Sequence, residues 1–240
     1  MPESVKVKFY FDIASPFSYI GLERLFCHKK AWNLSIELCP VHLGTVLKSS
    51  GNFPPFSSSS VKHEYMIMDI MRSARELQIP FNLRMNGPPI SSFDNMATLR
   101  ALKILLSQED FSQVIRELYS ARFGNVTLPD DIFTYLAPVH ISQDLLDKAK
   151  LNARSEEFKL VFEKEHEDLV NNHGAFGVPW IMVQKPGDSH LEHFWGSERL
   201  SSIAHWLGPS YEYNSKIEIK GSYSPKCQFI PTTGTHTAVE

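Results

Sequence analysis

The sequence predicts an α/β protein whose small sheet is interrupted by a long, all-helical insert. Three observations predict this class. Two alternating apolar runs flank one helical segment within residues 4–45, helical periodicity dominates residues 61–172, and strand patterns return at residues 179–196. The expected order is therefore β-α-β, then the insert, then β-β-α.

The first unit reads as strand, helix, strand. The segments "VKVKFYFD" (5–12) and "LSIELCPVHL" (34–43) alternate, and "FSYIGLERLFCHKKAW" (17–32) has the helical period. Pro16 suits the first position of this helix. Because a helix joins the two strands, we expect them to be parallel, with a right-handed crossover.

The insert is expected to follow a loop. Residues 46–60, "VLKSSGNFPPFSSSS", are dense in Ser, Pro and Gly, which favour turns. The helices predicted after this loop are 61–78, 91–108, 111–124 and 155–174, with shorter ones at 129–138 and 142–152.

The last unit reads as a hairpin and a helix. "PWIMVQKPGDSHLEHFWG" (179–196) predicts two strands joined at Pro-Gly-Asp-Ser, and "SERLSSIAHWLG" (197–208) predicts a helix with Ser197 as its N-cap. Taken together, these elements follow the order of the thioredoxin fold.

The same patterns predict a division of the chain into domains. We expect a thioredoxin-like domain in two halves, residues 1–60 and 173–208. A helical domain, residues 61–172, is inserted between the halves, and a polar tail, residues 209–240, follows.

Composition excludes several classes of function. The net charge is -3 and the basic residues do not cluster, so nucleic acid is not an expected partner. No apolar run reaches the length of a membrane span. Cys27, Cys39 and Cys227 form no Cys-x-x-Cys pair, which argues against a disulfide framework or a thiolate zinc site. The histidines are scattered, so no metal is expected: His28, His63, His173 and His193.

The Ser15-Pro16-Phe17-Ser18 quartet lies where the first strand passes into the first helix. In redox proteins of this fold the same place holds a Cys-x-x-Cys pair, because a helix N-terminus stabilises a thiolate. Two serines exclude thiol–disulfide exchange by the chain itself at this place. A serine hydroxyl can still donate a hydrogen bond to the thiolate of another molecule. The alternative is that Ser15 only caps the helix.

The energies allow such a site to activate a bound thiol. A free thiol has a pKa of about 8.5, and lowering it by about two units requires about 2.7 kcal/mol of thiolate stabilisation. A hydrogen bond to a charged group contributes about 1.5–3 kcal/mol. The helix N-terminus adds about 0.3–1 kcal/mol. Together they suffice.

Two further segments fit a peptide-like thiol. Val178-Pro179 lies at the position of the cis-proline of the thioredoxin fold, which leaves the backbone of Val178 free to pair with a ligand. Gly196-Ser197-Glu198 offers N–H groups and a hydroxyl to a carboxylate, and an acidic group to an ammonium. Each has an ordinary alternative, namely a strand start and a helix cap. A thiol site, a pairing edge and an amino-acid clamp together describe glutathione.

Four segments carry a resemblance to a known family over residues 5–208: "DIASPFSYIG", "SGNFPP", "GAFGVP" and "FWGSERL". In this order they resemble the kappa-class glutathione transferases and are similar to their bacterial relatives, the hydroxychromene carboxylate isomerases. Phe17 replaces the tyrosine of the family pattern, Tyr19 its tryptophan and Glu198 its aspartate.

The resemblance implies a role for each matching residue. Ser15 would be the catalytic residue that hydrogen-bonds the glutathione sulfur. Val178, before cis-Pro179, would pair with the cysteinyl backbone, while Ser197 and Glu198 would hold the γ-glutamyl end. The remaining implied positions are Asn52 and Lys62 for the tripeptide, and Phe17 and Tyr19 for the wall facing the electrophile. Lys62 fits a solvated lysine on a helix face nearly as well.

The resemblance also implies an activity. The protein would conjugate glutathione, its co-substrate, to small electrophiles and would reduce organic hydroperoxides, with no permanently bound cofactor. The alternatives are a glutathione-dependent isomerase and a non-catalytic thioredoxin-like binding module. The family further implies a homodimer in mitochondria or peroxisomes. The N-terminus and the C-terminal "TAVE" carry no recognisable targeting signal, which leaves the cytosol open.

Overall fold

The computed structural model describes residues 3–54, 59–82, 92–124, 131–136 and 141–213. Its centre is a four-stranded mixed sheet with the strand order β2-β1-β3-β4. The strands are β1 (Val5–Phe11), β2 (Leu34–Pro40), β3 (Trp180–Gln184) and β4 (Leu191–Trp195). The predicted fold class is confirmed, because the helices of the insert lie in sequence between β2 and β3.

Strand pairing follows the predicted pattern. β1 and β2 are parallel, with Val5 opposite Leu34, and helix α1 (Pro16–His28) connects them. β3 runs antiparallel to β1, with Tyr10 opposite Trp180. β3 and β4 form the expected antiparallel hairpin.

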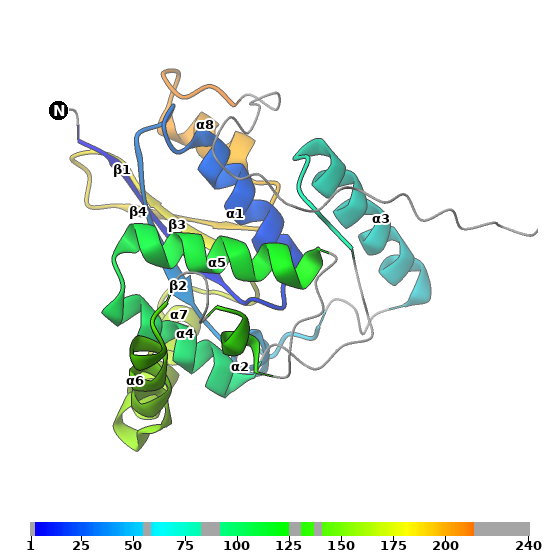
Figure 1. Cartoon of the computed structure of the whole chain (residues 1–240). Helices are drawn as coiled ribbons and strands as arrows, with labels where there is room; N and C mark the ends of the chain where they lie inside the picture. Colours follow the sequence, from blue (N-terminus) through cyan, green and yellow to red (C-terminus); the bar gives the residue numbers. More distant parts are fainter. Residues whose placement is uncertain (1–2, 55–58, 83–91, 125–130, 137–140, 214–240) are drawn as a thin grey trace, which may run out of the picture.

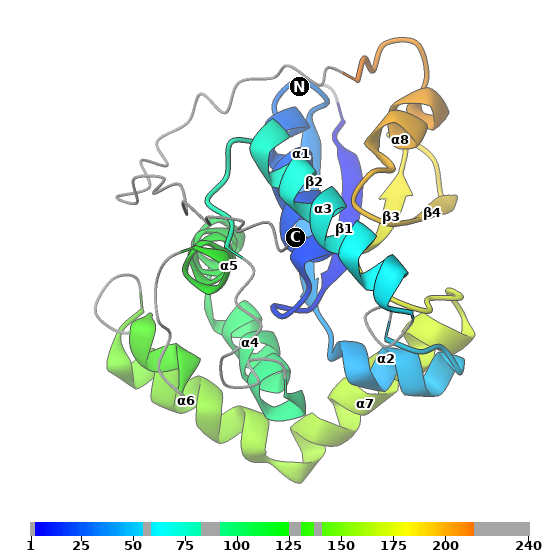
Figure 2. The same ribbon diagram turned by 90° about the vertical axis from the view of Figure 1, so that its right-hand side faces the viewer.

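Seven further α-helices and one short 3-10 helix are described. They are α2 (Leu43–Ser50), α3 (Ser60–Glu76), α4 (Phe93–Leu105), α5 (Gln108–Phe123), the 3-10 helix η2 (Ile132–Tyr135), α6 (Gln143–Arg154), α7 (Glu156–Asn171) and α8 (Leu200–Leu207). Figure 1 and Figure 2 show α6 and α7 at one end of the molecule and α8 at the other. Helix α3 contacts α1, and α2 contacts α7.

The sheet and the insert share one apolar core. Its largest cluster joins side chains of β1 and α1, such as Phe9 and Leu22, to side chains of α4 to α6, such as Leu99 and Leu146. A smaller cluster on Trp180 and Met182 of β3 also contains residues of α2 and α7. The insert is therefore packed on the sheet, and the predicted domain boundaries stay predictions.

The predicted loop at 46–60 is wrong in its first part, because residues 43–50 form helix α2. A side-chain nitrogen of His42, Nδ1, accepts a hydrogen bond from the Thr45 N–H at 3.3 Å and caps the helix. Val46 and Leu47 are buried, and Gly51 ends the helix with a φ of 70°. Two buried side chains on one short helix leave little periodic signal in the sequence.

The predicted start of the last helix is also wrong. Helix α8 begins at Leu200, its N-cap position is Arg199, and residues 197–199 form a turn. Ser197 is therefore not an N-cap. Of the predicted tail, residues 214–240 lie outside the described residues; nearer the body, the Glu212 carbonyl accepts a hydrogen bond from the Trp32 indole at 3.0 Å.

Candidate functional site

The start of α1 is held by its own cap. The Ser15 hydroxyl oxygen accepts a hydrogen bond from the Ser18 N–H at 3.1 Å, and the Ser15 N–H donates to the Asp12 carbonyl at 3.0 Å. The buried Asp12 carboxylate accepts from the Ala14 N–H at 2.9 Å, which fixes the link between β1 and α1. Because Ser15 acts as an acceptor in the cap, its O–H remains able to donate to a ligand.

The segment before β3 has the geometry expected from the sequence. The Val178–Pro179 peptide bond is cis, as predicted. The Pro179 carbonyl accepts a hydrogen bond from the Gly196 N–H at 3.1 Å, so this segment is joined to the turn after β4. Val178 makes no main-chain hydrogen bond to any residue of the described ranges, which leaves its peptide groups available for pairing.

Asn52 holds this segment from the other side. Its side-chain nitrogen donates to the Phe176 carbonyl at 2.8 Å, and its side-chain oxygen accepts from the Phe53 N–H at 2.8 Å. Both ends of the amide are thus engaged within the protein. The observed contacts of Asn52 orient the segment before Pro179, whereas its expected contact with the tripeptide stays a prediction.

Gly21 is the point at which three distant segments meet. A Cβ atom at this position would lie 3.3 Å from Pro179 Cγ, 3.4 Å from Ser197 Cα and 3.5 Å from a ring carbon of Phe9. A glycine here allows α1 to approach both predicted binding segments closely. Ser15, the N-cap of α1, lies six residues before Gly21, which is about 9 Å along the helix axis.

The turn at 196–198 is compact. Gly196 has a φ of 109°, a conformation that favours glycine. The Glu198 carboxylate folds back over it, since a Cβ at Gly196 would lie 2.7 Å from Glu198 Oε2. Arg199 Nη2 lies 3.4 Å from Glu198 Oε1, and Ser197 is only 4% exposed. The Glu198 carboxylate therefore lies beside the buried Ser197, and the expected role of these two residues in holding the γ-glutamyl end stays a prediction.

Arg24 fixes this turn, although no sequence motif marks it as a functional residue. Its guanidinium donates to the Ser197 carbonyl at 3.1 Å and, toward α3, to Glu76 at 2.9 Å and to Ser73 Oγ at 3.4 Å. Arg24 follows Gly21 by three residues and shares its helix face. The signal in the sequence is a charged residue one turn after a glycine on the same helix face. This signal does not identify the partners of Arg24, because they are remote in the sequence.

The remaining predicted residues are placed differently. Tyr19 is 1% exposed and stacks on the rings of Tyr119 and Phe123, so the expectation that it lines a wall for an electrophile is wrong. Its position on α1 directs it into the core toward α5. Phe17 is half-buried against the main core, and Lys62 is exposed on α3. Within the described part of the chain, no hydrogen bond or ion pair joins Lys62 to the other predicted residues.

The two cysteines of the described residues, Cys27 and Cys39, favour the neutral thiol over the thiolate. Burial raises the pKa of the Cys39 thiol to about 11, and burial also raises the pKa of Cys27. Among the described residues, no group of three or more His, Cys, Asp or Glu side chains is arranged to hold a metal ion. The histidines are less scattered than expected, because the rings of His173 and His193 lie 5.4 Å apart.

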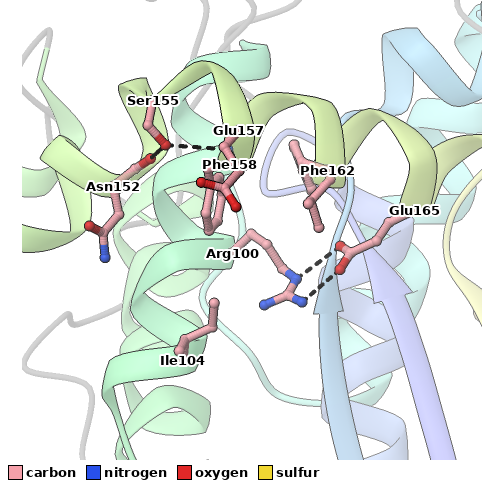
Figure 3. Close-up of a pocket in the computed structure, with 9 residues that line it drawn as sticks. Arg100, Ile104, Asn152, Ser155, Glu157, Phe158, Phe162 and Glu165 are labelled. Carbon is pink, nitrogen blue, oxygen red and sulfur yellow. Dashed lines mark hydrogen bonds and ion pairs between the residues drawn. The ribbon is translucent and has the colours of Figure 1, made fainter.

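A cavity of about 260 Å³ opens elsewhere, between α4, α6 and α7. Figure 3 shows Arg100 of α4 and Glu165 of α7 reaching toward each other, with two hydrogen bonds of 2.9 and 2.6 Å. Phe158 and Ile104 lie beside them. The lining includes none of the predicted site residues, so this hollow is separate from the candidate site. Within the described residues no helix has the length and apolar character needed to span a membrane.

Comparisons with known proteins show the family of the chain. A family profile described as a DSBA-like thioredoxin domain matches residues 6–208. Glutathione S-transferase kappa 1 of Caenorhabditis elegans is 30% identical over 223 residues, which cover 86% of this chain and 92% of that protein. A 2-hydroxychromene-2-carboxylate isomerase of Pseudomonas putida is 26% identical over 223 residues, covering 88% and 98%.

Among solved structures, a 2-hydroxychromene-2-carboxylate isomerase superposes with a TM-score of 0.66 at 23% identity, over 84% of this chain and 94% of that one. At this identity the likeness supports the fold alone. With the profile match and the near full-length relatives, it leads to one conclusion. The chain belongs to the DSBA-like thioredoxin family, within the group of kappa-class glutathione transferases and 2-hydroxychromene-2-carboxylate isomerases.

Proposed function

We propose that the protein is a glutathione transferase that activates the glutathione thiol at the start of α1. One observation carries the proposal. The cis-Pro179 segment and the Ser197 turn meet α1 at Gly21, on a helix that begins with a buried serine in place of a cysteine. The relatives named glutathione transferases support the same substrate.

The proposed mechanism needs binding and thiolate stabilisation only. The Val178 peptide groups would pair with the cysteinyl residue of glutathione, and the 197–198 turn would hold its γ-glutamyl end. The Ser15 O–H would donate to the sulfur, and the N-terminal N–H groups of α1 would add a partial positive charge. The thiol proton leaves to solvent, and the thiolate then attacks the electrophile, forming the carbon–sulfur bond as the leaving group departs.

An isomerase is the second candidate, because one near full-length relative carries that name. In an isomerase the glutathione sulfur adds to the substrate and leaves again. The chemistry at Ser15 would be the same, and only the fate of the adduct would differ.

Two measurements test the proposal. Isothermal titration with glutathione should give saturable heat, and mass spectrometry after incubation with glutathione and chlorodinitrobenzene should find the glutathionyl product with loss of chloride. Release of unmodified glutathione and an isomerised hydroxychromene carboxylate would favour the isomerase. Absence of glutathione binding would favour a non-catalytic binding module. Reduction of insulin disulfides by the purified protein would contradict all three.

A further inference from the structure

Arg24 is a buried cation that joins three parts of the fold. It is 8% exposed in the middle of α1, and its guanidinium reaches the Ser197 carbonyl at 3.1 Å and the Glu76 carboxylate of α3 at 2.9 Å. A third, longer contact goes to the Ser73 hydroxyl at 3.4 Å. The planar fork of arginine can hold such partners in one fixed geometry, which a lysine cannot reproduce.

Stability alone does not account for this arrangement. The Glu76 side chain is 42% exposed, and ion pairs with an exposed partner contribute little. A well-packed apolar side chain in the place of a buried ion pair is often equally stable or more so. What Arg24 supplies, and an apolar residue would not, is a fixed position for the main chain of Ser197.

The neighbouring residue provides an internal comparison. Glu23, also buried in α1, forms two hydrogen bonds of 2.8 and 2.7 Å with Arg116 of α5. This ion pair joins α1 to the insert and does not involve the 196–198 turn. Two adjacent charged residues of one helix thus each form an ion pair with another helix, but of the two only Arg24 contacts the turn.

We propose that Arg24 is a positioning residue that sets the Ser197–Glu198 turn for the γ-glutamyl group and so selects glutathione over thiols that lack this group. The inference rests on the proposed function. Arg24 lies beneath the turn and acts through it, while the sulfur is activated at Ser15. Loss of Arg24 should therefore weaken recognition of the γ-glutamyl end and leave sulfur chemistry intact.

Kinetics with two thiols test this inference. Cysteinylglycine is the probe, because it has the thiol and the glycine of glutathione but no γ-glutamyl group. In Arg24→Met the KM for glutathione should rise about tenfold, consistent with a lost hydrogen bond to a charged group. The kcat at saturating glutathione and the KM for cysteinylglycine should stay as in the wild type. Arg24→Lys keeps the charge, and its KM for glutathione should lie between those of the wild type and Arg24→Met.

Arg116→Met is the matched control. It leaves the Glu23 carboxylate in α1 without its arginine, but it should retain the wild-type preference for glutathione. If Arg24→Met kept the preference for glutathione over cysteinylglycine, the inference would be overturned and the proposed function would stand. An equal loss of this preference in Arg116→Met would have the same consequence. A wild type with no preference for glutathione over cysteinylglycine would overturn the proposed function and the inference with it.

Amide hydrogen exchange separates positioning from a general loss of stability. Arg24→Met should speed exchange at the amides of residues 197–200 relative to those of β1, whereas Arg116→Met should not. Equal acceleration throughout the chain in Arg24→Met would contradict a positioning role.

Discussion

The region around Gly21 and the cavity in the insert are built in opposite ways. At Gly21, segments far apart in the sequence meet through a main-chain hydrogen bond and a close approach that leaves little room for a side chain. The cavity is lined by side chains of α4, α6 and α7, and the Arg100–Glu165 pair is part of this lining. A site built from backbone tolerates little change in size, whereas a lining of exposed side chains can adjust. The cavity between α4, α6 and α7 is therefore not where the chemistry is expected.

Gly21→Val should have the largest effect on glutathione affinity, in contrast to a substitution of similar size in the insert. The valine would press on Pro179 and Ser197, because its Cβ alone would lie 3.3–3.4 Å from atoms of these two residues. Overpacking of this kind costs about 1–3 kcal/mol of stability. We expect a loss of glutathione affinity of about tenfold or more, measured by titration calorimetry. Ala149→Val, at a fully buried position of α6, is the control.

The control should lose similar stability in urea unfolding but keep its affinity for glutathione. If Ala149→Val weakened glutathione binding as much as Gly21→Val, the two regions would not be separable, and the candidate site would extend into the insert.

Breaking the ion pair in the insert should have a smaller effect. The Arg100 and Glu165 side chains are 23% and 36% exposed, so their pairing contributes at most about 1 kcal/mol. Arg100→Met with Glu165→Gln should lower the free energy of unfolding by about that amount and leave the KM for glutathione unchanged. A KM that rose severalfold in this double variant would place the cavity within the functional site.

The smallest effect should come from His166, a buried residue of α7 outside the Gly21 region. His166 of α7 accepts the His42 N–H at 2.8 Å and contacts the Phe162 carbonyl through its other ring nitrogen at 2.6 Å. Burial lowers the pKa of His166. The unfolded chain therefore binds a proton at His166 more readily than the folded chain does. The contribution of neutral His166 to the free energy of unfolding is complete above about pH 6.5. It is lost progressively as the pH falls toward the folded-state pKa.

Urea unfolding at several pH values measures this dependence. His166→Gln keeps an acceptor but does not titrate, so its unfolding free energy should be lower at neutral pH and flatter below about pH 6.5. An unchanged slope in the variant would assign the pH dependence to other groups.

Local patterns made most of the fold predictable. The strand–helix–strand unit and the hairpin have strong periodicity, and Ser15 and Pro179 follow from their places in that order. Helix α2 was missed because it buries only Val46 and Leu47. The last helix was placed too early because Ser197 has the type of a cap but lies in a turn.

The parts of the site that escaped prediction depend on contacts between distant segments. Gly21 ends the segment "DIASPFSYIG", but its role as a contact point requires Pro179 and Ser197 to be packed against it. The partners of Arg24 lie 49, 52 and 173 residues away in the sequence. Tyr19 belongs to a cluster of aromatic rings from α1 and α5, and only the packing of these helices shows which way it faces.

The measurement that tests the central claim most directly is the ultraviolet absorbance of the glutathione thiolate, titrated with pH, in complexes with the wild type and with Ser15→Ala. We predict that the pKa of bound glutathione is below about 7.5 in the wild type, against about 8.5 for a free thiol, and that Ser15→Ala loses this shift. The same pKa in both complexes would contradict the account and leave Ser15 as a helix cap.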